Sequence, residues 1–276
     1  MNNDIIPTTQ INGTPKNDDS KKTILNNSVI PIWQPQGYST NHIAKCVGDL
    51  FDTKATHTGT LDPMAQGVIV VLTGNQRHKR YSLSDLKKTY TFDIVFGLST
   101  DTFDAMGIIT DNNLNSINTS IFNIQSIQQH CNDFIGQYSQ NIPVFSAHLH
   151  KGKKLFEYGH LQKKIQTPVK KGVIYDFKIT KLENKSFFEV VNNIIVQINN
   201  VKGNFRQQKI INQYQKLLNN YSRDSKLFVA SFVVQTSKGI YIRSLSQDLC
   251  KSLSTLGFCN GITRTNNGEY SIENSK

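Results

Sequence analysis

The sequence predicts a mixed α/β domain of the α+β kind, built around one large sheet. Apolar segments with strand periodicity outnumber those with helical periodicity, and the two kinds do not alternate regularly, which argues against a doubly wound fold. The chain of 276 residues, 37% of them hydrophobic, is long enough to bury one large core. We expect one domain over residues 25–276, preceded by a polar, disordered tail at residues 1–24.

The first elements follow from short local patterns. The apolar run Val29–Trp33 predicts a strand, and Pro31 places it at a sheet edge because proline donates no backbone hydrogen bond. Ser39 or Thr40 is a suitable cap for the helix that follows. The apolar positions of this helix lie at helical spacing on one face: Ile43, Val47 and Leu50.

A second group of elements surrounds the segment "HTGTLDPMAQG". The run "VIVVLTG" after it predicts a strand buried on both faces. The basic stretch "NQRHKRYSLSDLKK" predicts a helix, and "KTYTFDIVFG" alternates as a strand should. "LSTDTFDAMG" predicts a loop that ends this strand.

The second half is less regular. A helix is expected over Ile124–Phe134 and a strand over Val173–Ile179. Residues 184–224 are rich in Asn, Gln and Lys and predict an inserted loop with some helix. A strand, a turn at Ser237–Gly239, a short strand through Tyr241 and a final helix follow.

Composition limits the partners and the compartment. A formal net charge of +11 favours a polyanionic partner such as nucleic acid or an acidic membrane surface, although solubility alone is an alternative explanation. The four cysteines form no C-x-x-C pair, so we expect neither a zinc site nor a disulfide framework. With no apolar stretch long enough to cross a bilayer, we expect a cytoplasmic protein.

Asp62 is the first candidate for chemistry. It lies in a turn rich in Gly, Thr and Pro, immediately before the predicted buried strand. Such an Asp is either an Asx-turn or capping residue, or a nucleophile or general base on a rigid mount. Local sequence alone leaves both interpretations open.

Arg243 and two tyrosines are further candidates. Arg243 in "GIYIRSL" is either a surface Arg at the start of a helix or a functional residue. A cation is unfavourable at a helix start and calls for a carboxylate partner, and Asp62 is the partner we expect. Tyr90 and Tyr241 are either core aromatics or groups that stack on a base or transfer a proton.

Two further clusters have weaker signals. Asp101 and Asp104 have a spacing that suggests a metal site only weakly, and a turn is the simpler explanation. The lysines of "HKGKKLFEY" alternate with aromatic residues, which suits contacts to RNA phosphates and exposed bases, although a solvated loop is the alternative. These lysines are Lys151, Lys153 and Lys154.

Five ordered segments together resemble the bacterial tRNA pseudouridine-55 synthases, the TruB family. They are "QPQGYST", "HTGTLDPMAQG", "KTYTFDIVFGLSTDTFDAMG", "IPVFSAHLHKGKKLFEYG" and "GIYIRSL". The resemblance implies a pseudouridine synthase fold with a mainly antiparallel sheet. It also implies that a uridine in the T-loop of tRNA is flipped out of its stack and isomerised, with no metal or organic cofactor and no protein partner, by a monomer.

The resemblance assigns roles residue by residue. Asp62 matches the catalytic Asp, Tyr90 the Tyr that stacks on the target base, and Arg243 the Arg that pairs with the carboxylate. His57 matches a residue that holds the T-loop, Tyr241 lies beside Arg243, and Ile262 loosely matches an apolar residue of the pocket.

The sequence departs from the family pattern at several positions. Gln34 replaces a Lys, Thr56 replaces a Gly, and "FCNGITRTNNGEY" matches its region only partly. We also expect the small C-terminal RNA-binding PUA domain to be absent, with tRNA binding weaker or shifted to Lys151–Lys171. Two alternatives stay open: a synthase acting on another RNA site, and a non-catalytic tRNA-binding chaperone.

Overall fold

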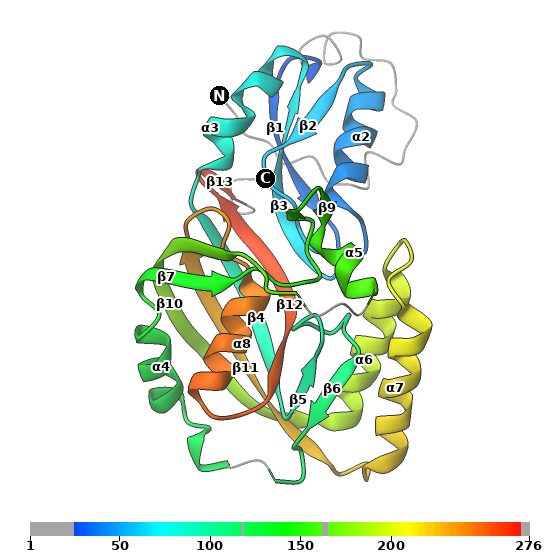
Figure 1. The fold of residues 1–276 in the computed structure, drawn as a ribbon, viewed down its shortest axis with the longest axis vertical. Helices are drawn as coiled ribbons and strands as arrows, with labels where there is room; N and C mark the ends of the chain where they lie inside the picture. The colour runs from blue at the N-terminus through cyan, green and yellow to red at the C-terminus, as the bar shows by residue number, and fades with distance from the viewer. Residues whose placement is uncertain (1–24, 117–118, 162–164, 272–276) are drawn as a thin grey trace. The chain divides into compact units, whose positions relative to one another are not determined.

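The computed structural model describes residues 25–116, 119–161 and 165–271 (Figure 1). The predicted tail at residues 1–24 lies outside the described residues. The strands are β1 (Val29–Gln34), β2 (Ala55–His57), β3 (Gln66–Thr73), β4 (Lys88–Phe96), β5 (Leu98–Thr100), β6 (Ile109–Asn112), β7 (Gly136–Asn141), β8 (Leu149–His150), β9 (Lys153–Lys154), β10 (Val169–Ser186), β11 (Lys226–Thr236), β12 (Gly257–Asn267) and β13 (Tyr270–Ser271). The α-helices are α2 (Thr40–Leu50), α3 (Arg80–Ser84), α4 (Ile124–Asn132), α5 (Leu155–His160), α6 (Phe187–Asn200), α7 (Gln207–Asn220) and α8 (Ile242–Ser252).

The predicted mixed α/β fold with one large sheet is confirmed. Nine strands of the described chain form a mainly antiparallel sheet in the order β1-β3-β12-β4-β11-β10-β7, with β2 paired to β3 and β13 paired to β12. Strands β12 and β3 pair in parallel. Two small hairpins, β5–β6 and β8–β9, stand outside this sheet.

The chain divides into two compact units. Of the described residues, the first comprises 25–91, 200–203 and 261–271, and the second comprises 92–116, 119–161, 165–199 and 204–260. Strands β4 and β12 each contribute residues to both units.

The first unit is organised around β3, which is buried on both faces as predicted. Its even-numbered residues Val68, Val70 and Leu72 form a cluster with Tyr270. Helix α2 begins as expected, because the Ser39 side chain accepts a hydrogen bond from the backbone N–H of His42. Strand β1, with Pro31, lies at the end of the sheet order, which confirms its edge position.

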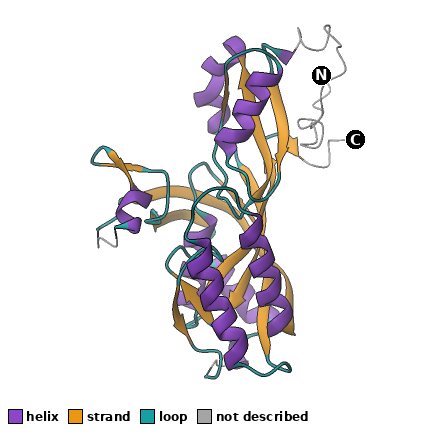
Figure 2. Ribbon diagram, turned by 90° about the vertical axis from the view of Figure 1, so that its right-hand side faces the viewer, coloured by secondary structure: helices purple, strands orange, loops and turns teal. Residues whose placement is uncertain are grey.

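The second unit has an aromatic core. Phe92, Phe177 and Phe232 lie on three neighbouring strands, with ring centroids 5.3 to 6.1 Å apart. Helix α4 packs on β10 and α8, while α6 and α7 run side by side (Figures 1 and 2).

Two predictions about this unit are wrong. Residues 184–224 are not a loop with some helix, because β10 continues to Ser186 and two helices of 14 residues follow. The Asn and Gln content concealed the apolar face of α6, whose buried residues Phe187, Val190, Val191, Ile194 and Ile198 are spaced three or four apart. Tyr241 also ends no strand; it is the residue that precedes α8.

Candidate active site

In the first unit, the Asp62 turn is held by hydrogen bonds on both sides. The backbone N–H of Leu61 donates to Oγ1 of Thr40 over 2.9 Å, and the N–H of Ala65 donates to the Asp62 carbonyl, also over 2.9 Å. The Pro63 carbonyl accepts from the N–H of Gly37 at 2.9 Å. The half-buried Asp62 therefore sits on a fixed backbone, which suits a group that must be aimed at a substrate.

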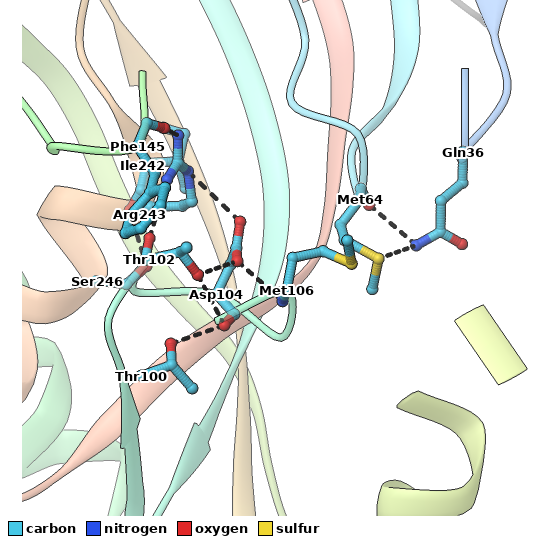
Figure 3. Close-up of polar contacts among 10 residues, drawn as sticks. All are labelled: Gln36, Met64, Thr100, Thr102, Asp104, Met106, Phe145, Ile242, Arg243 and Ser246. Atoms are coloured by element: carbon cyan, nitrogen blue, oxygen red, sulfur yellow. Dashed lines mark hydrogen bonds and ion pairs between the residues drawn. The ribbon is translucent and has the colours of Figure 1, made fainter. Parts of the chain in front are cut away.

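Gln36 adds a side-chain contact to the same turn. Its Nε2 donates to the carbonyl oxygen of Met64 over 3.0 Å and lies 3.8 Å from the Met64 sulfur (Figure 3). Gly37, the residue after Gln36, has a φ of +94°. A Cβ at this position would lie 2.7 Å from the Asn200 carbonyl oxygen. The glycine of "QPQGYST" is thus required by its backbone and by a close neighbour.

Arg264, on strand β12, supports the approach to this turn, and the sequence did not predict its importance. Its side chain is 1% exposed, its Nε donates to the Val68 carbonyl over 2.7 Å, and its Nη2 donates to the Gly59 carbonyl over 3.2 Å. The guanidinium therefore joins the start of β3 to the approach of the Asp62 turn. The available signal was an Arg at an inward position of an otherwise alternating strand, within the partly matched final motif.

His57 lies at the end of β2 and is buried. Its Nε2 is 2.8 Å from Oδ1 of Asn41. Burial, followed by the nearby charges of Arg80 and Arg264, lowers the pKa of His57 from 6.5 to about 4. His57 is accordingly neutral at pH 7.

The two departures near this turn have simple structural explanations. Thr56 lies within β2, opposite Leu72 of β3, in extended backbone that any residue adopts. Gln34 is fully buried, and its Nε2 donates to the Tyr38 carbonyl over 2.8 Å, so it supports the turn before α2.

Tyr90 and Ile262 also belong to the first unit. Tyr90 lies on β4 and is buried with 9% of its surface exposed, while Ile262 on β12 is 6% exposed. Both side chains are almost fully buried, and their predicted contacts to the target base stay predictions.

In the second unit, Arg243 is held in a buried polar shell. Its side chain is 3% exposed, and it donates from Nη1 to the Thr102 carbonyl over 2.9 Å and from Nη2 to the Phe145 carbonyl over 3.1 Å. Its Nε lies 3.5 Å from Oδ2 of Asp104 (Figure 3). Three directions of the planar guanidinium are therefore fixed.

Asp104 is a carboxylate partner of Arg243 that the sequence did not predict. It is 6% exposed, and its Oδ1 accepts from Oγ1 of Thr102 at 2.6 Å and from the N–H of Met106 at 2.9 Å. Asp101 is instead paired with Arg206, with distances of 2.7 and 3.1 Å. The two aspartates of the D-x-x-D segment thus each form an ion pair with a different arginine. The described residues contain no cluster of three His, Cys, Asp or Glu able to hold a metal ion.

Tyr241 precedes Arg243 by two residues, and its backbone is fixed by one side chain. Its N–H donates to Oε1 of Gln140 over 2.6 Å, and its carbonyl accepts from Nε2 of the same residue over 3.3 Å. This pair sets the start of α8 and with it the position of Arg243.

The three predicted lysines lie together on the β8–β9 hairpin and its end, and all are exposed. Lys151 and Gly152 form the turn, both with positive φ, and Nζ of Lys154 lies 5.6 Å from the centroid of the Phe156 ring. The hairpin therefore presents three cations to solvent beside an aromatic ring, which suits a phosphate backbone.

The predicted site residues thus fall into two groups. Asp62, Tyr90, His57 and Ile262 belong to the first unit, while Arg243, Tyr241 and the three lysines belong to the second. The pairing of Asp62 with Arg243 stays a prediction. None of the helices described is long and apolar enough to cross a membrane.

Comparison with known proteins identifies the family. Residues 49–205 match the model of the TruB family pseudouridylate synthase, N-terminal domain. The tRNA pseudouridine synthase B of Caldanaerobacter subterraneus is 27% identical over 248 residues, covering 90% of this chain and 71% of its own length. That of Caldicellulosiruptor saccharolyticus is 28% identical, covering 90% and 69%.

Solved structures agree in fold. A chain from a Cbf5-Nop10-Gar1 complex superposes with a TM-score of 0.54 at 16% identity, covering 91% of this chain and 52% of that one. A chain from an H/ACA RNP bound to a substrate RNA containing 2'-deoxyuridine gives 0.53 at 16%, covering 93% and 52%. This chain spans about half the length of these solved chains, and the likeness at this identity shows the fold alone. From the family match and the curated relatives, the chain belongs to the TruB family of pseudouridylate synthases.

Proposed function

We propose that this chain isomerises uridine to pseudouridine in tRNA, at position 55 of the T-loop. The observation that carries the proposal is the braced carboxylate turn at Asp62 in a member of the TruB family. The reaction breaks the bond between N1 and the ribose and forms a bond from C5 to the same carbon. A proton leaves C5 and one is gained at N1, so no redox cofactor is needed.

The proposed roles follow from the local chemistry. Asp62 is the nucleophile that attacks the nucleotide, because a half-buried carboxylate on a fixed turn is already oriented. Arg243 would orient that carboxylate and stabilise its ionised form. Tyr90 would stack on the flipped base and assist removal of the C5 proton, with Ile262 lining the same pocket and Tyr241 lying beside Arg243.

RNA binding is proposed to begin with the exposed cations. A net charge of +11 and the lysines of the β8–β9 hairpin attract the phosphates of the T-arm. Flipping a base costs a few kcal/mol, which contacts to the backbone and to neutral His57 would offset. We further propose that the enzyme acts in the cytoplasm as a monomer, which sedimentation of the purified protein tests.

One experiment tests this function. Purified protein is incubated with an unmodified tRNA transcript and no added cofactor, and pseudouridine is mapped at single-nucleotide resolution. Product at position 55 is expected. Product at another position would favour a different RNA target, and none in any RNA would favour a non-catalytic tRNA-binding protein.

A further inference from the structure

We propose that Arg206, at the start of α7, is a positioning residue that fixes the loop carrying Asp104 and through it the guanidinium of Arg243. This inference rests on the proposed function. Arg206 lies in the segment between β10 and β11, which the sequence predicted to be mostly loop and to which none of the matched motifs extends.

Two contacts fix the Arg206 side chain. Its guanidinium forms a two-point ion pair with Asp101, Nη1 to Oδ2 at 2.7 Å and Nη2 to Oδ1 at 3.1 Å. Its Cζ also lies 4.4 Å from the centroid of the Phe145 ring. A planar guanidinium can form the two-point pair and lie against the ring at once, whereas a lysine ammonium is a point charge that cannot form the two-point pair.

Both partners of Arg206 connect directly to the shell of Arg243. The Phe145 carbonyl accepts from Nη2 of Arg243 over 3.1 Å. Asp101 closes the hairpin that contains Asp104: its Oδ1 accepts from the N–H of Ile108 over 2.8 Å, and its own N–H donates to the Ile108 carbonyl over 3.0 Å. Arg206 therefore stabilises both sides of the Arg243 environment through Phe145 and Asp101.

Helix α7 supports the same hairpin at further points. Oε1 of Gln213 accepts from the N–H of Ile109 over 2.9 Å, and the buried Tyr214 hydroxyl lies 3.5 Å from the Ala105 carbonyl oxygen. The α7 helix thus lies along the loop from residue 101 to residue 109.

The backbone of Arg206 supports a specific role. Its φ is +68°, in the left-handed region, which is strained for a residue with a Cβ. Gly203, three residues earlier, also has a positive φ, but the position at 206 is occupied by an arginine and not by a glycine. The sequence retains Arg at a strained position, where its side chain makes the ion pair and the ring contact.

The test uses single-turnover pseudouridine formation on a tRNA transcript at saturating enzyme, with tRNA affinity measured separately. Arg206→Gln is expected to lower the rate at least about tenfold, equivalent to about 1.4 kcal/mol, with affinity changed less than about twofold. Arg206→Lys should fail to restore the rate, because charge alone does not reproduce the two-point pair. The exposed Arg223 provides the control: Arg223→Gln removes the same charge and should behave as the wild type.

Asp101→Asn separates positioning from general stability. It keeps the oxygen that accepts from Ile108 but weakens the pair with Arg206, so it should lower the rate similarly, and the double variant should be no slower than Arg206→Gln alone. Weakened tRNA affinity at an unchanged rate, additive effects of the two changes, or restoration by lysine would each overturn the inference. A wild type that forms no pseudouridine in any RNA would instead overturn the proposed function, whereas an active wild type with an equally fast Arg206→Gln would overturn this inference alone.

Discussion

The buried pair between Asp104 and Arg243 gives a quantitative prediction for stability. Asp104→Asn keeps the oxygen that accepts from Thr102 and Met106 but removes the charge 3.5 Å from Nε of Arg243. Both side chains are less than a tenth exposed, so the remaining cation stays buried. Removing one partner of such a pair costs about 3–5 kcal/mol. Arg243 retains its bonds to two carbonyls, so we expect the lower end, about 3 kcal/mol.

The assay is urea unfolding followed by circular dichroism, with the free energy extrapolated to water and the slope m compared between variants. The matched control is Asp101→Asn, whose pair with Arg206 is about a quarter exposed on both sides and should cost less than about 1 kcal/mol. If both variants lost the same free energy at equal m, the reasoning from burial would be refuted.

Three further predictions concern the first unit and the basic hairpin. Asp62→Asn should abolish turnover while leaving tRNA affinity nearly unchanged; a parallel collapse of binding would identify Asp62 as a structural turn residue. Because the folded pKa of His57 is about 4, below its ordinary 6.5, only the unfolded chain takes up a proton between these values. Stability should therefore fall as pH drops through this window, by up to about 3 kcal/mol more in the wild type than in His57→Gln; equal acid sensitivity would contradict this. Replacing Lys151, Lys153 and Lys154 by Gln should reduce the slope of log affinity against log salt by about 2 to 3, and an unchanged slope would exclude the hairpin from phosphate binding.

The sequence was sufficient to predict those elements whose structure is determined by a single local feature. The cap at Ser39, the edge position of Pro31 and the buried strand β3 are confirmed, because a hydroxyl, a missing N–H and a run of β-branched residues each determine a local outcome. Helices α6 and α7 were missed because their polar faces dominate the composition, although the spacing of apolar residues in α6 was present in the sequence.

The site could be predicted only partly, for a physical reason. Motifs identify Asp62 and Arg243 as candidates, but they carry no information on which buried groups a side chain contacts. Asp104 and Asp101 have similar sequence surroundings, yet each pairs with a different arginine, one 139 residues and the other 105 residues along the chain. For Arg264, the sequence shows an Arg at an inward strand position but not which groups it contacts. Such pairings depend on tertiary structure.

The contacts of Arg264 have a consequence for how the protein is made. Its bonds to Val68 and Gly59 join residues 196 and 205 positions apart, and Gly67, with a φ of +127°, leaves no room for a Cβ against the backbone nitrogen of Arg264, 2.6 Å away. The turn that carries Asp62 is translated well before β12, the strand on which Arg264 lies. Closing so long a loop is entropically expensive and slow. During synthesis on the ribosome, therefore, the turn that carries Asp62 would gain the support of Arg264 only after the long segment between them has been translated.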